Sequence, residues 1–290
     1  MNAANIGIAI TDSNDWTARA LVRSIEARGA TPIPFRLSEM DSFTFNPPEI
    51  DEMDIVIVRD VGAGAFEEVS YKFDLLRILA ETIPVINTPE SIRNAANKYY
   101  SLYLLKKAGI PVPETVVTGN PDVVMEMLCE WDDLVIKPIF GYKGIGIARF
   151  QSDSDLLGSN RSSVGEILAE RGVTYLQEFI PITRDIRAFV VGDQIAGSIY
   201  RYARDGWITN LSHGGTPERC VLDSEQEEIA IKASGAIGTT FAGVDIAETD
   251  EGSVVLEING TPSGRGVFEA CGVDVARDIV EYAISITRGL

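Results

Sequence analysis

Two carboxylates and one amide stand at spacings that could bind a cation. They are Asp245, Glu257 and Asn259, within the stretch 243–262, where two apolar runs flank a polar turn at 249–252. This pattern predicts a β-hairpin. Because strand side chains alternate between faces, Glu257 and Asn259 point the same way, and Asp245 lies almost opposite Glu257 if the hairpin closes symmetrically. Oxygen ligands of this kind suit Mg²⁺ or Mn²⁺ held together with nucleotide phosphates. A soluble hairpin with exposed acids is the alternative.

A lysine and a glycine-rich turn predict phosphate binding. Lys137 interrupts the apolar run at 134–138, and a lysine inside a strand needs an anionic partner because burying it alone is costly. The segment GYKGIG at 141–146 follows directly, and glycines let backbone N–H groups approach a phosphate. The order of a Walker loop is missing, and an ordinary hairpin turn is the alternative. The strand lysine beside it favours phosphate.

Other polar residues have roles that the residues alone leave open. Gln177 and Glu178 lie inside an expected strand, TYLQEFI. Such a strand can offer backbone groups to an adenine and a carboxylate to a ribose or amine. An edge strand with a solvated face is the alternative. Lys98 lies inside an expected helix, where a lysine usually faces solvent. The sole histidine, His213, is more typical of a surface or hydrogen-bonded residue than of a catalyst.

The first hundred residues alternate between strands and helices. We expect strands at 5–10, 31–35, 54–59 and 84–87, and helices at 16–28, 70–81 and 90–108. Such βαβ patterning implies a small parallel sheet, with the proline-containing strand at 31–35 favoured for an edge. No Gly-x-Gly-x-x-Gly follows the first strand, so a dinucleotide-binding dehydrogenase is excluded.

The remaining two thirds of the chain predict mainly hairpins. Beyond a stiff IPVP connector at 110–113, we expect strands at 134–138, 147–150 and 174–180, a loop at 153–160 and a helix at 163–171. Two further strands join at Gly192–Asp193 and contribute Arg184, Asp185, Arg187 and Arg201. A loop at 207–215, then helices at 223–239 and 273–287, complete the pattern.

Composition limits the classes of protein. A chain of 290 residues with 45% hydrophobic content can bury a large core and has more than one domain. It has no apolar run long enough for a membrane span, and its N-terminus lacks the basic region of a signal peptide. Three scattered cysteines and one histidine fit a reducing cytoplasm and exclude common zinc spacings. The net charge of −18 argues against nucleic-acid binding through the general field.

Taken in order, these segments resemble ATP-grasp enzymes, and in detail the RimK-type α-L-glutamate ligases. The matching segments are Asn97-Lys98, IPVPET, VIKP, GYKGIG, QEFI, RDIRAFVVG, Arg201, NLSHGG, GVDIAE and LEINGTP. The ending EINGTPSGRG is closer to methanogen-type ligases that glutamylate pterin or deazaflavin coenzymes than to ligases of lysine biosynthesis.

The resemblance implies an α/β and α+β fold in three parts. An N-terminal parallel α/β domain would cover 1–95, a small lid domain 112–178, and a C-terminal antiparallel-sheet domain with the metal site 179–290. ATP would lie between the lid and the C-terminal domain.

The resemblance also implies roles for individual residues. ATP contacts would come from Lys98, Lys137, Gly141, Lys143, Gly144, Gly146, Gln177, Glu178, Phe179, Ile180 and Asp185. Asp245, Glu257 and Asn259 would hold two Mg²⁺ (or Mn²⁺) ions. Arg187, Arg201 and Asn210 would surround the transferred phosphoryl group and the acceptor carboxylate.

The implied reaction joins an amine to a carboxylate. ATP phosphorylates the carboxylate, and the amine attacks the acyl phosphate to give an amide, ADP and phosphate. The expected partners are ATP, L-glutamate and an anionic carboxylate acceptor such as tetrahydromethanopterin; the oligomeric state, a homo-oligomer included, is left open. A different amino acid, a protein-tail or small amino-acid acceptor, and an ATP-binding regulatory module without chemistry are the alternatives.

Overall fold

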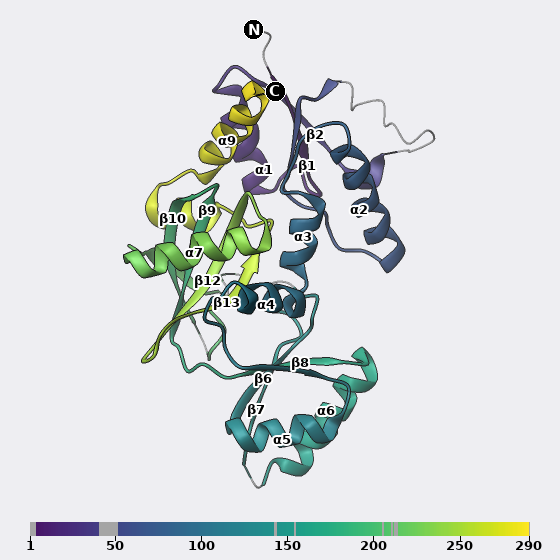
Figure 1. Cartoon of the computed structure of the whole chain (residues 1–290), viewed down its shortest axis with the longest axis vertical. Helices are drawn as coiled ribbons and strands as arrows, with labels where there is room; N and C mark the ends of the chain where they lie inside the picture. The colour runs from purple at the N-terminus through teal and green to yellow at the C-terminus, as the bar shows by residue number, and fades with distance from the viewer. Residues whose placement is uncertain are drawn as a thin grey trace.

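The computed structural model describes residues 4–40, 52–141, 144–153, 155–204, 206–209, 211 and 214–289. These residues form three β-sheets, one parallel and two antiparallel. We name them the N-terminal, middle and C-terminal sheets. In Figure 1 the N-terminal sheet is at the top, the middle sheet at the bottom, and the C-terminal sheet between them. The predicted combination of a parallel α/β sheet with antiparallel sheets is confirmed.

The N-terminal sheet has the strand order β2-β1-β3-β4. Its strands are β1 (Asn5–Ala9), β2 (Thr31–Phe35), β3 (Ile55–Val58) and β4 (Val85–Ile86), and its helices are α1 (Trp16–Glu26), η1 (Leu37–Glu39), α2 (Phe66–Ala80) and α3 (Pro89–Ala96). Strand β2 lies at the edge, as its prolines predict, because proline cannot donate to a ladder on both sides. Asp15 caps α1 by accepting a hydrogen bond from the Ala18 N–H.

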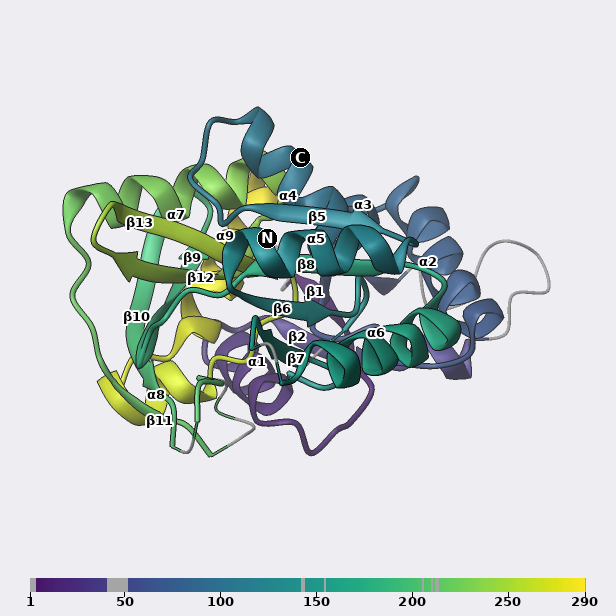
Figure 2. The same ribbon diagram turned by 90° about the horizontal axis from the view of Figure 1, so that it is seen from below.

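The middle sheet has its own small core. Its order is β5-β8-β6-β7, with β5 (Thr115–Thr118), β6 (Asp133–Lys137), β7 (Ala148–Gln151) and β8 (Thr174–Glu178). Helices α5 (Pro121–Trp131) and α6 (Leu157–Arg171) cover one face, which Figure 2 shows nearest the viewer. The buried side chains between them are Val124, Leu128, Leu134, Ile136, Phe150, Val164 and Leu176.

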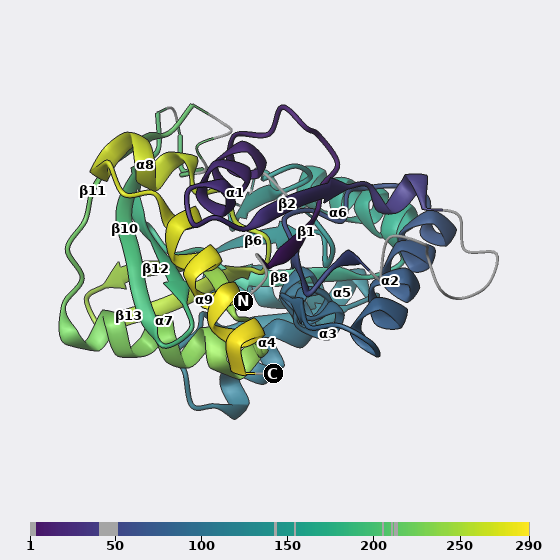
Figure 3. The ribbon, with the colours of Figure 1, turned by 90° about the horizontal axis from the view of Figure 1, so that it is seen from above.

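The C-terminal sheet has the order β11-β10-β9-β12-β13. Its strands are β9 (Arg184–Val191), β10 (Gln194–Tyr202), β11 (Thr216–Arg219), β12 (Phe241–Thr249) and β13 (Gly252–Asn259). Helices α4 (Lys98–Lys107) and α7 (Ser224–Ile237) pack on one face, and α8 (Arg265–Cys271) and α9 (Val275–Gly289) on the other. Helix α9 also packs against α1, so the N-terminal and C-terminal sheets share one apolar core (Figure 3).

Strand β9 shows how the sequence divides core from site. Ile186, Ala188 and Val190 point into the core beneath α7, while Phe189 points to the opposite face, into the core beneath α9. By strand alternation, Arg187 lies on the Phe189 face but nearer the start of the strand. One face of the sheet is therefore apolar core at one end and charged at the other.

The helix expected at 90–108 is wrong as a single helix. Helix α3 ends at Ala96 and α4 begins at Lys98, because Asn97 leaves the helical conformation and bridges Phe140. The Asn97 side chain then caps α4 by accepting a hydrogen bond from the Tyr100 N–H at 3.0 Å. Lys98 is consequently the first residue of a helix, not a mid-helix residue.

Other boundaries also differ from expectation. Helix α6 begins at Leu157, inside the expected loop 153–160, and α2 begins at Phe66 rather than Ser70. The start of α6 was missed because its sequence, GSNRSS, is polar and mostly exposed, so it lacks the apolar periodicity that predicts a helix. The elements β5, α5, β11 and α8 were not predicted. Among the described residues, no helix has the length and apolar character needed to cross a membrane.

Candidate active site

Three charged residues form one row across the C-terminal sheet. Asp245 on β12 pairs with Glu257 on β13, as predicted, and with Arg187 on β9. A bulge after Asp245 leaves Leu256 unpaired without disturbing this register. Asn259 lies two residues beyond Glu257, on the same face, opposite Gly243. The hairpin therefore brings both predicted carboxylates and the amide to one face of the sheet, on its last two strands.

Asp245 belongs to a buried network of charges. Arg187 binds both of its carboxylate oxygens, through Nε to Oδ1 and through Nη2 to Oδ2 at 2.9 Å. Arg201 on β10 lies 2.8 Å from Oδ2 and also binds Asp185, which it faces across the β9–β10 ladder. Thr209 donates to Asp185 at 2.7 Å. Two arginines and two aspartates thus neutralise each other.

Burial makes this pairing necessary. Asp185, Arg201 and Asp245 are 3%, 4% and 6% exposed, and an unpaired charge at such depth is costly. Burial acts to raise the pKa of Asp245, but Arg187 and Arg201 outweigh it and hold that pKa below its usual value. Burial acts to lower the pKa of Arg201, but the two aspartates outweigh it and hold that pKa above its usual value. Asp245 and Arg201 are therefore both charged at neutral pH.

Gly243 gives the Arg187 side chain its place. A Cβ atom at this position would lie 2.9 Å from Nη1 of Arg187 and 3.0 Å from its Cδ. Real side chains do not approach so closely, so only glycine lets the guanidinium lie against β12. Gly243 stands in the GVDIAE segment, but nothing in the sequence indicated this packing role.

Lys98 joins the hairpin to the glycine segment. Its Nζ donates to Oε1 of Glu257 at 2.9 Å and to the Gly141 carbonyl at 3.2 Å. Its backbone N–H donates to the Ile139 carbonyl at 3.1 Å. Only 10% of the Lys98 side chain is exposed, so it is not the solvent-facing lysine that the helical pattern favoured.

Lys137 reaches the same region from the middle sheet. Its Nζ donates to Oε1 of Gln177 at 2.5 Å. Burial lowers the pKa of Lys137 to about 8, with Lys98 adding to the shift and Glu257 and Asp245 opposing it. The charges of Glu257 and Asp245 on the C-terminal sheet therefore act on Lys137 of the middle sheet, which lies below the C-terminal sheet in Figure 1.

The Gln177 side chain holds Lys137 and its surroundings. Gln177 is 2% exposed, and its Nε2 donates to the Tyr175 hydroxyl at 3.2 Å and to Oγ1 of Thr115 at 3.3 Å. Burial raises the pKa of Tyr175 to about 12, so this hydroxyl stays neutral. The amide of Gln177 is thus committed within the middle sheet, a role that its position in the expected strand did not indicate.

The end of β8 is anchored on both sides. Oε1 of Glu178 accepts a hydrogen bond from the Glu114 N–H at 3.1 Å. The Arg149 guanidinium stacks over the Phe179 ring, with Cζ 3.6 Å from the ring centroid. The Phe179 and Trp207 rings pack edge to face. These contacts hold the side chains of Glu178 and Phe179 at the end of β8.

The structure brings most of the predicted site residues together and leaves some outside its description. Nine of them form three sets of contacts: Lys98 with Gly141 and Glu257, Lys137 with Gln177, and Arg187 and Arg201 with Asp185 and Asp245. Gly144 and Gly146 have φ values of 72° and 76°, which favour glycine. Lys143, Asn210 and His213 lie outside the described residues.

The residues present fit a magnesium site made with nucleotide phosphates. The Glu257 side chain is 37% exposed, and Asn259 Oδ1 accepts one hydrogen bond, from the Thr261 N–H at 2.9 Å. Asn259 Oδ1 keeps a second lone pair, and Glu257 binds Lys98 through Oε1, which leaves Oε2 for a cation. Oδ2 of Asp245, in contrast, already accepts from both Arg187 and Arg201. Among the described residues, no three His, Cys, Asp or Glu side chains form a metal cluster of their own. A cation here would need phosphate ligands as well.

No sequence pattern indicated a role for Asn87, although it binds the backbone at the start of β12 and just after β13. It follows β4 and is fully buried. Its Nδ2 donates to the carbonyls of Phe241 and Gly260 at 2.7 and 2.6 Å, and its Oδ1 accepts from the N–H groups of Thr240 and Phe241. One side chain of the N-terminal sheet therefore fixes both strands that carry the carboxylates.

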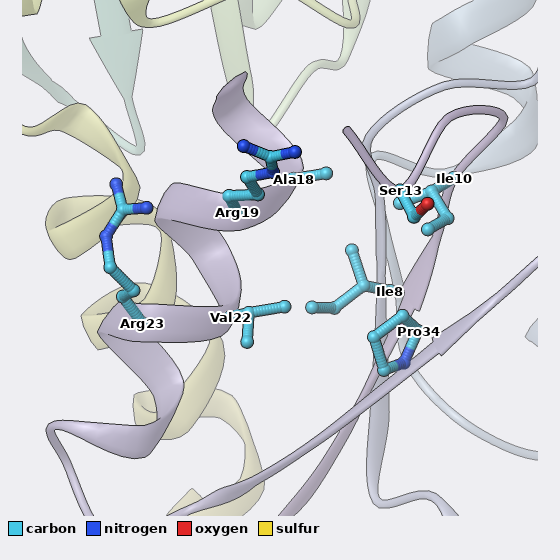
Figure 4. Close-up of a pocket in the computed structure, with 8 residues that line it drawn as sticks. All are labelled: Ile8, Ile10, Ser13, Ala18, Arg19, Val22, Arg23 and Pro34. Atoms are coloured by element: carbon cyan, nitrogen blue, oxygen red, sulfur yellow. The ribbon is translucent and has the colours of Figure 1, made fainter. Parts of the chain in front are cut away.

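A cavity of about 330 Å³ lies elsewhere, between α1 and the strands β1 and β2. It is lined by Ile8, Ile10, Ser13, Ala18, Arg19, Val22, Arg23 and Pro34. In Figure 4, Val22 faces Ile8 across it, whereas the Arg23 guanidinium points away. None of the charged site residues lines this cavity, so the candidate site is defined by the charged row.

Comparison with known proteins agrees with this geometry. The model of the RimK-like ATP-grasp domain matches residues 95–283. The chain is 47% identical to the tetrahydromethanopterin:alpha-L-glutamate ligase of Methanosarcina acetivorans, over 97% of this chain and 99% of that protein. It is 32% identical to the ligase of the same name from Methanococcus maripaludis, over 96% of this chain and 98% of that protein.

Solved structures agree on the fold. The ATP-grasp ligase PsnB, in complex with a phosphomimetic variant of its minimal precursor, Mg and ADP, has a TM-score of 0.77 at 20% identity. The match covers 98% of this chain and 99% of that chain, and at this identity it shows the fold alone. The predicted ATP-grasp fold and the predicted ligase class are both confirmed. The chain belongs to the RimK-like ATP-grasp family.

Proposed function

We propose that this protein adds L-glutamate to a carboxylate of a tetrahydromethanopterin-type coenzyme, with ATP converted to ADP and phosphate. The 47% identity to a ligase of that name supports the substrate class. The observation that carries the chemistry is that Asp245 binds Arg187 and Arg201 while its neighbour Glu257 binds Lys98, and that the charges of both carboxylates act on Lys137. Such a site suits a polyphosphate, a cation and a second anion.

The reaction needs positioning and charge neutralisation more than a nucleophilic side chain. An oxygen of the acceptor carboxylate attacks the γ-phosphorus of ATP, and ADP leaves. The glutamate amine then attacks the acyl carbon, and phosphate leaves with an oxygen that came from the acceptor. Positive charge from Lys98 and Lys137 stabilises the phosphates, and that of Arg187 and Arg201 stabilises the transferred phosphoryl group and the acceptor.

The remaining roles follow from the contacts. Asp185 and Thr209 hold Arg201 in place, and Gln177 holds Lys137. Asp245, Glu257 and Asn259 hold two Mg²⁺ ions, for which Mn²⁺ can substitute. When bound, these ions supply neutralisation of the phosphate charge. Lys143 and Asn210 complete the phosphate and acceptor contacts in this proposal.

Residues 1–95, 112–178 and 179–290 act as the N-terminal, lid and C-terminal domains. The separate core of the middle sheet supports a lid that moves as a unit. An acyl phosphate hydrolyses readily, so closure of this lid would protect it from water. The free cysteines among the described residues support a reducing cytoplasm as the compartment.

An ADP-release screen tests the proposal. Purified protein, ATP, Mg²⁺ and L-glutamate are incubated with tetrahydromethanopterin, a deazaflavin coenzyme, a glutamate-ended peptide and a small amino acid. We expect ADP release with the pterin and a product heavier by one glutamyl residue in mass spectrometry. ATP binding without ADP release for any acceptor would contradict the proposal and favour a regulatory module.

A further inference from the structure

Arg59 joins the N-terminal sheet to the segment that follows the metal-binding hairpin. It comes directly after β3, and its side chain is 12% exposed. Its Nε and Nη2 bind the two oxygens of Asp15 at 2.8 and 3.1 Å, and its Nη1 donates to the Thr261 carbonyl at 3.0 Å. Asp15 thus holds the guanidinium by two bonds, in the orientation that reaches Thr261.

Thr261 passes this constraint to Asn259. The Thr261 N–H donates to Asn259 Oδ1 at 2.9 Å, while the Thr261 carbonyl accepts from Arg59. The first bond decides the orientation of the amide, since only its oxygen can accept. That oxygen keeps one lone pair for a cation. A loop free to move at Thr261 would let the amide turn away.

Neighbouring contacts hold other points of the same loop. Asn87 donates to the Gly260 carbonyl at 2.6 Å, and Oγ1 of Thr17 accepts from the Gly264 N–H at 3.1 Å. These bonds fix the two ends of the loop. Between these two points, the contact from the N-terminal sheet is the hydrogen bond from Arg59 to the Thr261 carbonyl.

We propose that Arg59 is a positioning residue for the metal site, and that it acts through Thr261 on the orientation of Asn259. The proposal rests on the proposed function, because it assumes that Asn259 is a metal ligand. The N-terminal domain would then contribute directly to the geometry of the metal site. It would hold a ligand of the metal in place through Thr261, which lies 202 residues from Arg59 in sequence.

The test compares Arg59→Met with Arg28→Met. Arg28 also joins the N-terminal helix α1 to the C-terminal region, through Glu281 of α9, but touches neither Thr261 nor Asn259. Mn²⁺ affinity is measured by electron paramagnetic resonance at saturating ADP, and ADP affinity without metal by calorimetry. Replacing the outer partner of a metal ligand typically weakens affinity by about 10- to 100-fold, so we expect a loss in this range for Arg59→Met.

The other readouts separate positioning from general stability. We expect ADP affinity without metal to be unchanged in both variants, and Mn²⁺ affinity to be unchanged in Arg28→Met, even if both melt at lower temperature. Arg59→Lys keeps the charge but has one nitrogen in place of the planar fork that binds Asp15 and Thr261 together, so its Mn²⁺ affinity should lie between wild type and Arg59→Met. If Arg59→Met does not fold, Asp15→Asn replaces it, because asparagine still caps α1 but holds Arg59 less firmly.

Two outcomes overturn the proposal in distinguishable ways. Wild-type Mn²⁺ affinity in a folded Arg59→Met or Asp15→Asn variant would remove the role of Arg59 and leave the metal site standing. A wild-type protein that binds no Mn²⁺ in the presence of ADP would remove the metal site itself, and the role of Arg59 with it.

Discussion

Lys98 and Glu257 form an ion pair, with 2.9 Å between Nζ and Oε1, across the boundary between α4 and β13. The lysine amine also donates to the Gly141 carbonyl, so it links the hairpin to the start of the glycine segment. The Glu257 carboxylate is the more exposed partner, at 37% against 10% for the lysine side chain. When a cation and a nucleotide phosphate bind together, the cation can take the place of Lys98 beside Glu257, and the phosphate can take the place of Glu257 beside Lys98. Each charged side chain then still faces an opposite charge.

Glu257→Gln should impair catalysis more than folding. The amide keeps the shape but removes the charge, so Mg²⁺ binds more weakly and Lys98 loses its counter-charge. We expect turnover to fall by at least ~10²-fold, as for loss of a main electrostatic group. Steady-state rates over a Mg²⁺ titration measure the effect. Glu251→Gln, in the exposed turn of the same hairpin, is the control, and near-normal activity of Glu257→Gln at ordinary Mg²⁺ would refute the assignment.

ATP affinity should depend on pH through Lys137. Its pKa of about 8 in the free protein lies below the usual 10.5, so it loses its proton as the pH rises through 8. Bound phosphate stabilises the protonated amine and raises its pKa, so binding takes up a proton above pH 8. Calorimetry should therefore show tight binding below pH 8 and weaker binding above it.

Two lysine variants separate this effect from general charge. Lys137→Ala should weaken ATP binding and remove the pH dependence near 8. Lys106→Ala should do neither, because its side chain is 45% exposed and only loosely paired with Glu114. Equal effects in the two variants would mean that Lys137 does not contact the nucleotide.

Gly243→Ala should damage the site through one methyl group. The added Cβ would push the Arg187 guanidinium away from Asp245. We expect kcat to fall by up to ~10²-fold, since displacements of about 1 Å can cost that much. In the control, Gly235→Ala, the new Cβ meets nothing within 4 Å on α7, and stability should rise by about 0.5–1 kcal/mol. An active Gly243→Ala enzyme would show that Arg187 need not occupy this position.

The order of the chemistry can be read from an oxygen label. With ¹⁸O in the acceptor carboxylate, one labelled oxygen bonds to phosphorus when the acyl phosphate forms, and leaves with the phosphate when the amine attacks. Mass spectrometry of the inorganic phosphate released after glutamate addition should therefore detect ¹⁸O. Unlabelled phosphate, or labelled AMP, would rule out this order.

Much of the fold was predictable because its signals are local. The β-hairpin that carries Asp245, Glu257 and Asn259 follows from strand alternation and a polar turn, and its register places the carboxylates opposite each other as expected. Prolines put β2 at an edge, as predicted. Asp15 and Thr88 are residue types that favour helix N-caps, and each caps the helix that follows it. The break at Asn97 escaped prediction, because its cause is a bridge to Phe140, far along the chain.

The sequence by itself determined which residue types meet at the site: oxygen ligands on a hairpin, a strand lysine beside a glycine segment, and arginines on the neighbouring strands. Only the tertiary structure decided how they are held. Asp185 binds Arg201, Gln177 accepts a hydrogen bond from Lys137, and Asn87 binds the backbone of both hairpin strands. Each of these bonds joins different strands or sheets, and its geometry depends on how whole elements pack. Local propensity and periodicity carry no information on such contacts.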